Sequence, residues 1–371
     1  MGTGPFAVPS FEALRASGQH DLLMVITRPI KNFADAKTKS VANPVRAWAD
    51  QHQLKVIDPP TINDDGAIAL VSQLQPDLLV VCDYGEILSS TALTAARLGG
   101  INLHGSLLPR HRGAAPVQWS ILRGDKITGA CAIHMTPRLD GGPVISRVTT
   151  AIGVDETAGE LEKRLSELGV ECCLDAISKL DQCMSLEECE ELGERQDSSL
   201  ATPAPRLAKS DGQLDFRYPT ALIDRQIRGL QPWPGAFGNI RIGDAKELRV
   251  IVGKASILGQ RLPAKTIGDQ SLLSEQAIKK VEPGEIFWGP ALRKIFESVL
   301  QRGVDGEDRV PLMVVACDDG YLEIEQIQPA GKKMQLAREF LAGYGKTESL
   351  RFLVPQPDVA HRLLEKMRPA K

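Results

Sequence analysis

The chain has 371 residues, of which 43% are hydrophobic and 25% charged, so it is long enough for two or three globular domains and too apolar to be disordered. No apolar run is long enough to cross a membrane, and no basic-then-apolar leader opens the chain, so we expect a cytoplasmic protein. The seven cysteines form no CxxC pair, which favours free thiols and argues against a zinc site.

The net charge of −3 is unevenly distributed along the chain. Residues 151–200 hold fourteen acidic and four basic residues, a balance of −10, whereas residues 331–371 hold nine basic and four acidic residues, a balance of +5. A basic C-terminal part would suit a bound polyanion. An ordinary solvated surface would produce the same counts, so the charge alone leaves both interpretations open.

The chain opens directly on a glycine-rich turn, Gly2-Thr3-Gly4. In mononucleotide-binding folds a strand feeds such a turn and lies in the middle of the sheet. We therefore expect that strand to lie upstream of Met1. A chain that begins at Met1 should leave an apolar slot and unpaired backbone groups between two strands.

Apolar runs of strand length then alternate with helical patterns. Strands are expected at residues 22–27, 54–57, 77–82, 99–103, 129–135 and 144–152, and helices at residues 10–17, 44–52, 68–74 and 115–123. This alternation is typical of an α/β domain with a Rossmann-like, mostly parallel sheet. A capping box, Thr157-x-x-Glu160, opens a further helix with an apolar stripe. We end this domain at residue 186, and the acidic, then Ser- and Pro-containing segment 187–206 indicates a linker.

A second domain is expected over residues 207–345. Short alternating strands at 237–242, 248–251, 312–316 and 321–326 predict a small OB-like β-barrel. Residues 257–310 interrupt that pattern and indicate an insertion, partly helical around 291–300. Residues 346–371 form a basic tail that ends in an amphipathic helix at 359–367.

Side chains suited to carbonyl chemistry follow two apolar runs. If 99–103 is a strand, Asn102 and His104 project from the same face near its end, where open α/β sheets place ligands. Asp140 follows the next predicted strand. An amide can hold an oxyanion, an imidazole can move a proton and a carboxylate can orient the imidazole. A lone Asn or His at a strand end is more often an ordinary loop residue, so these side chains indicate a site only together with the longer motif around them.

That motif is Ser106-Leu107-Leu108-Pro109, followed by Arg110-x-Arg112-Gly113-Ala114-Ala115-Pro116, and it resembles the folate-dependent formyltransferases. Gly2-Thr3-x-Pro5-Phe6-Ala7, Tyr84-Gly85-x-Ile87-Leu88 and Leu139-Asp140-x-Gly142 support the resemblance. The second domain adds Pro232-Trp233-Pro234 and Gln328-Pro329-Ala330-Gly331-Lys332-Lys333. Glycinamide ribonucleotide formyltransferases lack this second domain, so the chain most resembles the methionyl-tRNA formyltransferase family.

The resemblance implies a donor, 10-formyltetrahydrofolate, and an acceptor, the α-amine of initiator methionyl-tRNA, with no metal. Asn102 would donate to the oxyanion, His104 would shuttle a proton and Asp140 would orient His104. The residues implied in folate binding are Ser106, Leu107, Leu108, Pro109, Tyr84, Ile87, Leu88 and Leu139, although core packing would also explain Leu107 and Leu108. Those implied in tRNA binding are Lys37, Lys39, Lys332 and Lys333. His111 and His134 have no counterpart in the family and are expected to be structural or solvated.

Other functions share the Asn102, His104 and Asp140 set. A nucleotide-sugar formyltransferase or a formyltetrahydrofolate hydrolase would use the same first domain, and an RNA-binding protein could use the barrel with an inactive first domain. The turn at Lys332-Lys333 favours the tRNA enzyme over the first two, and the intact set of three argues against the last.

Overall fold

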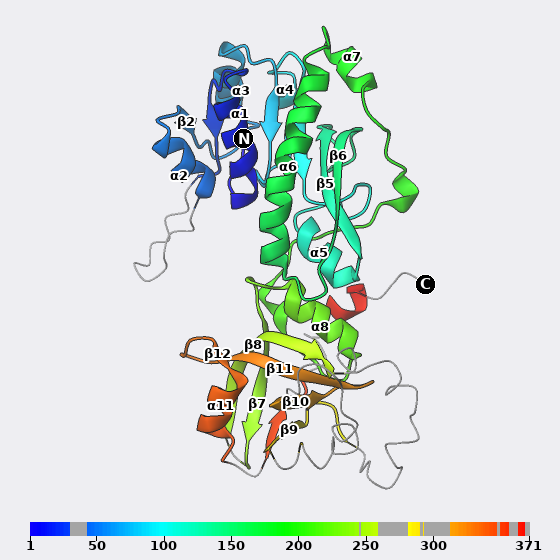
Figure 1. Ribbon diagram of the computed structural model, residues 1–371. Helices are drawn as coiled ribbons and strands as arrows, with labels where there is room; N and C mark the ends of the chain where they lie inside the picture. The colour runs from blue at the N-terminus through cyan, green and yellow to red at the C-terminus, as the bar shows by residue number, and fades with distance from the viewer. Residues whose placement is uncertain are drawn as a thin grey trace. The chain divides into compact units, whose positions relative to one another are not determined.

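The structure is a computed structural model that describes residues 1–29, 43–244, 246–258, 281–289, 292, 312–346, 349–355 and 363–367 (Figure 1). The chain divides into two compact units. Unit 1 consists of residues 1–120, 125–153 and 159–206, and unit 2 of residues 121–124, 154–158 and 207–371. None of the described helices is both long and apolar enough to span a bilayer.

Unit 1 is built from short strands joined mainly through helices, as the alternating pattern predicts. Its strands are β1 (Val25–Ile26), β2 (Val56–Ile57), β3 (Leu79–Val81), β4 (Gly100–His104), β5 (Ile127–His134) and β6 (Val144–Ala151). Its helices are η1 (Pro5–Ala7), α1 (Val8–Ser17), α2 (Pro44–Gln51), α3 (Asp65–Gln73), α4 (Ser90–Leu93), α5 (Pro116–Arg123), α6 (Ala158–Leu180), α7 (Leu186–Glu191) and η2 (Ser198–Leu200), of which α5 ends and α6 begins in segments that cluster with unit 2.

Four strands pair in the order β3-β4-β5-β6. β3 and β4 are parallel, as are β1 and β2, whereas β4-β5 and β5-β6 are antiparallel. The helix caps follow from sequence: Asn43, Asp64 and Ser89 each accept a hydrogen bond from the first turn of α2, α3 and α4. The predicted α/β class of this domain is confirmed.

The first three residues lie between β1 and β3. Gly2 N–H donates to the carbonyl of Ile26 (3.0 Å), and Cys82 N–H donates to the carbonyl of Met1 (3.0 Å). The α-amino group of Met1 donates to the carbonyl of Val80 at 2.6 Å, and burial lowers the pKa of this amine to about 5. The two neighbouring strands are thus bridged at one end. A strand upstream of Met1 stays a prediction.

Helix α6 confirms the apolar stripe expected after the capping box. Leu161, Leu165, Cys172 and Ala176 are fully buried. The helix lies against the sheet, since Cys172 Sγ donates to the carbonyl of Ala130 in β5 and Gly169 lies so close to Leu103 in β4 that a Cβ would sit 3.0 Å from its side chain. Figure 1 shows α6 running alongside the strands. Packing against β4 fixes the strand that carries Asn102 and His104.

The segment 187–206, expected to be a linker, lies against unit 1. Glu194 pairs with Val144 in β6, and Arg112 pairs with Pro203. Ala204 N–H donates to the carbonyl of Arg112 at 2.7 Å. The boundary between the two units falls after Arg206, which places the whole segment with the first unit.

Unit 2 is a nearly closed antiparallel sheet, so the expected barrel is confirmed. Its elements are η3 (Lys209–Gly212), α8 (Thr220–Gly229), β7 (Ala236–Ile242), β8 (Lys246–Ile257), β9 (Ile286–Trp288), β10 (Met313–Ala316), β11 (Tyr321–Pro329), β12 (Gln335–Leu336), α11 (Ala337–Tyr344) and β13 (Leu350–Phe352). The strand order is β13-β7-β8-β11-β10-β9, and an isolated bridge between Glu285 and Arg351 brings the two ends together.

Strand β9 lies inside the range 257–310 that the sequence indicated as an insertion, and it pairs with β10 as part of the sheet. Most of that range lies outside the described residues, and of the helix expected at 291–300 only Leu292, which is helical, is described. The expected tail helix is described only at residues 363–367, which are helical.

Candidate active site

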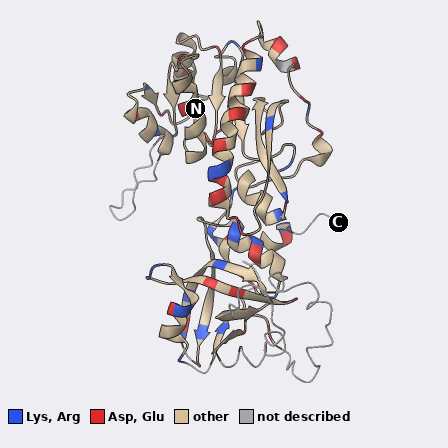
Figure 2. Cartoon of the chain, in the orientation of Figure 1, with Lys and Arg blue, Asp and Glu red and all other residues tan. Residues whose placement is uncertain are grey.

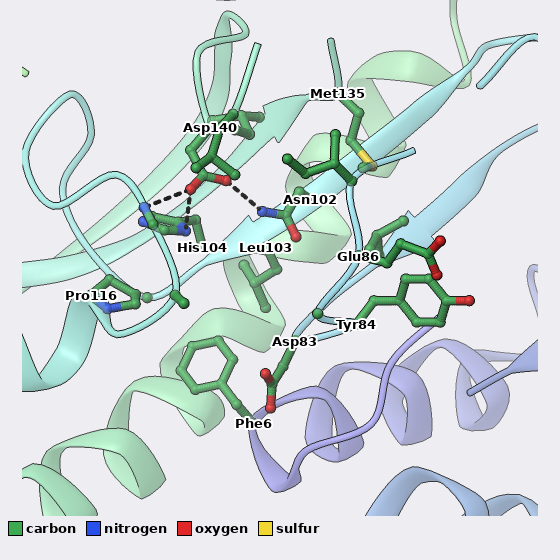
Figure 3. A pocket seen from close by; sticks show the side chains of 18 of the residues that line it. Phe6, Asp83, Tyr84, Glu86, Asn102, Leu103, His104, Pro116, Met135 and Asp140 are labelled. Carbon is green, nitrogen blue, oxygen red and sulfur yellow. Dashed lines mark hydrogen bonds and ion pairs between the residues drawn. The ribbon is translucent and has the colours of Figure 1, made fainter. Parts of the chain in front are cut away.

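A pocket of about 360 Å³ opens in unit 1 at the ends of β3 and β4. Its size falls within the usual range of small-molecule sites. Asn102 and His104, two positions apart on β4, both line it, and Asp140 joins them from the loop between β5 and β6 (Figure 3). The structure therefore brings together the three residues that the sequence suggested for carbonyl chemistry.

Asn102, His104 and Asp140 form a trio in which Asp140 lies next to the other two side chains. Its Oδ1 accepts a hydrogen bond from Asn102 Nδ2 at 3.4 Å, and its Oδ2 lies 3.8 Å from His104 Nδ1. The backbone N–H of Gly113 donates to Oδ2 at 2.8 Å. One N–H of the Asn102 amide is thereby directed at Asp140, and the other remains for a ligand.

The contact of His104 Nε2 determines which ring nitrogen of His104 carries the proton. His104 Nε2 lies 2.9 Å from the backbone carbonyl of His111. A carbonyl oxygen only accepts, so Nε2 carries a hydrogen and the neutral imidazole keeps its lone pair on Nδ1, the atom nearest Asp140. His104 is only 5% exposed, so little solvent competes for this arrangement. A histidine in this form can accept a proton through Nδ1.

The turn that carries Asp140 is held by a residue that sequence reasoning missed. Gln196 Nε2 donates to the carbonyls of Asp140 (2.9 Å) and Gly142 (2.7 Å), and its Oε1 accepts from both Nε and Nη2 of Arg112. Gln196 lies in the segment that the sequence indicated as a linker, and nothing in its local pattern signals this contact.

Gly113 is required as glycine for two reasons. Its φ of 133° lies in a region that side chains disfavour, and an added Cβ would lie 2.5 Å from the carbonyl oxygen of Ala204. Without that Cβ the loop can pass close enough for the Gly113 N–H to reach Asp140. The quoted motif contains Gly113, but its role as a donor to Asp140 could not be seen in the sequence.

Charged side chains line another part of the same pocket. Asp83 and Glu162 lie there with Arg206. Burial raises the pKa of Asp83 to about 6, against the opposing charge of Arg206. Burial also raises the pKa of Glu162, and the charge of Asp83 adds to that rise. A carboxyl group in a cleft with a raised pKa is a candidate functional group, and no motif in the sequence had singled it out.

Four of the residues implied in folate binding line the pocket: Tyr84, Ile87, Leu88 and Leu139. Tyr84 is 2% exposed, and burial raises the pKa of its hydroxyl to about 12. Ile87 and Leu139 are 54% and 50% exposed. Exposed apolar side chains at a pocket mouth can cover an aromatic ligand, which makes these two available for contact.

The other four, residues 106–109, are not among the residues that line this pocket. Leu108 is buried in a cluster with Cys131, Ile133 and Val144, with Leu107 packed against it. Ser106 Oγ donates to the carbonyl of Arg110 at 2.8 Å. Core packing, the alternative left open for Leu107 and Leu108, thus describes both in the structure, and the implied folate contact of this stretch receives no support from the pocket.

The lysines implied in tRNA binding fall in two places. Lys37 and Lys39 lie outside the described residues. Lys332 and Lys333 are exposed in the turn between β11 and β12, where Figure 2 shows the chain in the blue of Lys and Arg. Lys332 Nζ lies 5.3 Å from the ring centre of Tyr344. Among the residues that the structure describes, no group of three or more His, Cys, Asp or Glu could hold a metal ion.

Two family models match the chain in order. The formyl transferase model covers residues 1–177, and the model of the formyl transferase C-terminal domain covers residues 206–287 and 304–345. The chain therefore belongs to the formyl transferase family, which is folate-dependent.

The relatives narrow the comparison. The chain is 42% identical over 359 residues to a methionyl-tRNA formyltransferase of Rhodopirellula baltica, with 96% of each chain covered. It is 33% identical over 343 residues to that of Geobacter metallireducens, covering 92% of this chain and 94% of the relative. A crystal structure of an N-formyltransferase from Helicobacter canadensis, in complex with folinic acid and dTDP-3-aminofucose, aligns with a TM-score of 0.53 at 14% identity, over 90% of this chain and 97% of that one. This last likeness shows the fold.

Proposed function

We propose that the chain transfers a formyl group from 10-formyltetrahydrofolate to the α-amine of initiator methionyl-tRNA. The observation that carries this proposal is the trio of Asn102, His104 and Asp140 in the lining of one pocket. The chain that holds it matches a methionyl-tRNA formyltransferase over 96% of each chain. Each group has a defined task in moving a formyl group between two nitrogens.

The neutral amine attacks the formyl carbon, forming a C–N bond, and the carbonyl oxygen becomes an oxyanion. The free N–H of Asn102 donates to that oxyanion. His104 Nδ1 accepts the proton that the amine loses, and the Asp140 carboxylate at 3.8 Å stabilises the imidazolium. His104 then returns the proton to the folate nitrogen as the old C–N bond breaks, so protons and charges balance.

The pocket offers different chemistry to donor and acceptor. The pterin side of the donor would lie against the apolar and aromatic residues Tyr84, Ile87, Leu88 and Leu139. The acceptor amine would enter beside Asp83 and Glu162, whose carboxylates attract its protonated form and can take up the proton that must leave before attack. Phe6, also in the lining, offers apolar surface to an uncharged amino-acid side chain.

The charge pattern of unit 2 supports a polyanionic acceptor. Lys332 and Lys333 project from an exposed turn, and the C-terminal part of the sequence is net basic. Phosphate contacts from such lysines give affinity without sequence reading. A nucleotide-sugar acceptor would have no use for a separate basic surface of this kind.

The test is an acceptor comparison. The purified chain and 10-formyltetrahydrofolate are incubated with initiator methionyl-tRNA, with an amino-sugar nucleotide, or with neither. We expect formylated methionyl-tRNA, no formylated sugar and little formate release. Formylation of the sugar nucleotide alone, or rapid formate release without any acceptor, would replace the proposal with one of the other two formyl-folate activities.

A further inference from the structure

His111 is buried behind the site and does not touch the pocket. It is 2% exposed and is not among the residues that line the pocket, so it contacts no substrate there. Its backbone carbonyl is nevertheless the partner of the reactive histidine, accepting from His104 Nε2 at 2.9 Å. From the sequence, His111 was expected to be structural or solvated, and the structure gives it a direct contact with the trio.

The position of that carbonyl is fixed through the His111 side chain. Its ring Nε2 lies 2.6 Å from Asp125 Oδ2, and its backbone N–H donates to Thr202 Oγ1 at 2.9 Å. The φ of His111 is 60°, a left-handed conformation that is unfavourable for a residue with a Cβ and persists only when surrounding contacts impose it. The imidazole–carboxylate contact and the Thr202 bond are such contacts.

Two acceptors compete for the single proton of a neutral His104. If Nε2 carries it, the His111 carbonyl receives the hydrogen bond. If Nδ1 carries it, the hydrogen points toward the Asp140 carboxylate, 3.8 Å away, and Nδ1 can no longer accept a proton. A carboxylate is the stronger acceptor, so acceptor strength alone would place the hydrogen on Nδ1. The form with a free Nδ1 is retained because the His111 carbonyl is held in place at the shorter distance.

We propose that His111 is a positioning residue: held by Asp125, it presents its backbone carbonyl to His104 Nε2 and thereby keeps His104 in the form whose Nδ1 is free. The inference rests on the proposed function for its effect on rate. Its effect on the proton position of His104 does not depend on any activity.

The test uses His111→Asn and Asp125→Asn. Asparagine tolerates a left-handed φ, so His111→Asn removes the ring while leaving the backbone conformation accessible. Asp125→Asn keeps the shape of the partner and removes its charge, and it serves if the first variant folds poorly. The control is His52→Asn, which breaks another imidazole–carboxylate contact of unit 1, between His52 Nε2 and Glu12 Oε2 at 3.4 Å, outside the pocket.

Nitrogen-15 spectra of histidine-labelled, ligand-free protein report which ring nitrogen of His104 carries hydrogen. We expect Nε2–H in the wild type and in His52→Asn, and a shift toward Nδ1–H in the two test variants. Their kcat for formyl transfer should fall by about 10- to 100-fold, as for other residues that orient a reactive side chain, with KM for the folate unchanged.

An unchanged His104 spectrum in both test variants would overturn the proposal, whatever their rates. A changed spectrum with wild-type kcat would also overturn it, because the form of His104 would then not matter to the reaction. If the chain transferred no formyl group at all, the spectra would still decide whether His111 sets the proton position, so the two failures are distinguishable.

Discussion

Three residues around the pocket adopt left-handed backbone conformations although they carry side chains. Asp83 and Asp140 have φ of 48°, and His111 has φ of 60°. Each such residue costs on the order of 1–3 kcal/mol, which surrounding contacts must offset. Two of the three aim a carboxylate into the pocket and the third aims a carbonyl at His104. Gln53 and Gln75 are also left-handed and do not line the pocket, so such strain is not confined to the site, but at these three residues it sets directions that the proposed chemistry needs.

The raised pKa of Asp83 predicts that ionisation of this carboxyl lowers the free energy of unfolding as the pH rises. The folded protein holds the Asp83 proton up to about pH 6, whereas an unfolded carboxyl loses it near its ordinary value of 3.8. The folded state therefore binds more protons in this window, and this group lowers the free energy of unfolding as pH rises through it. Asp83→Asn cannot ionise, so its stability relative to the wild type should be greater at pH 7 than at pH 4. The difference should be no more than about 1 kcal/mol, because Asp83 is an exposed residue and solvent in the open pocket screens its charge.

Urea unfolding of both proteins at the two pH values measures this difference. Asp77→Asn, which changes a carboxyl that is 74% exposed and paired with Arg97, is the matched control and should show no such gain. An equal stability gap between Asp83→Asn and wild type at pH 4 and pH 7 would mean that Asp83 ionises normally.

Two elements of the chain, strand β4 and the segment 192–206, contribute the residues that build the site. β4 supplies Asn102 and His104, and the segment supplies Gln196, which holds the Asp140 turn through two backbone carbonyls. The segment also pairs with Arg112, whose neighbour Gly113 donates to Asp140. The trio therefore depends on a piece of chain far from it in sequence.

We predict that Gln196→Ala reduces kcat for formyl transfer by about tenfold, because the Asp140 turn loses its support. Its free energy of unfolding should fall by only about 1–2 kcal/mol. Gln226→Ala is the control, since Gln226 Nε2 makes two similar bonds to the carbonyls of Asp211 (2.8 Å) and Gln213 (3.0 Å) in unit 2. Rates and urea unfolding curves for both variants are the measurements. A Gln196→Ala enzyme with wild-type kcat would show that the turn holds itself.

Periodicity explains which parts of this site could be predicted from sequence. Alternation along a strand places Asn102 and His104 on one face, and the stripe of α6 marks its buried side. The roles of Gln196 and Asp125 could not be predicted, because their partners Asp140 and His111 lie 56 and 14 residues away in the sequence. Contacts between loops follow no repeating pattern. The motif at 106–109 suggested a ligand contact, but its apolar members face the core, a choice that short apolar runs do not reveal.

The two domains of the molecule present side chains of opposite charge. Unit 1 holds the pocket with its carboxylates, and unit 2 holds the exposed lysine turn. Both domains and their order could be predicted from the sequence, because each domain contains motifs of its own. The boundary was harder to place, since the segment before Arg206 has the composition of a linker yet packs on unit 1.

We predict that affinity for tRNA falls steeply with salt and depends on Lys332, Lys333 and the two lysines outside the described residues, Lys37 and Lys39. Replacing Lys332 and Lys333 by alanine should reduce the slope of log Kd against log salt by about one for each phosphate that is no longer neutralised. Lys55→Ala with Lys126→Ala, two exposed lysines outside the pocket lining, is the control. Filter binding over a salt series measures it. A flat salt dependence, or full affinity after all four charges are removed, would rule out this binding surface.

In the proposed mechanism Asn102, His104 and Asp140 carry out the transfer. The most direct measurement is the single-turnover rate of formyl transfer to initiator methionyl-tRNA by the wild type and by Asn102→Ala, His104→Ala and Asp140→Ala, each shown to be folded by circular dichroism. We expect each variant to lose most of the rate, with a loss of about 100- to 1000-fold for Asn102→Ala, as for other oxyanion donors. A folded His104→Ala protein that transfers the formyl group at nearly the wild-type rate would rule out this role of His104.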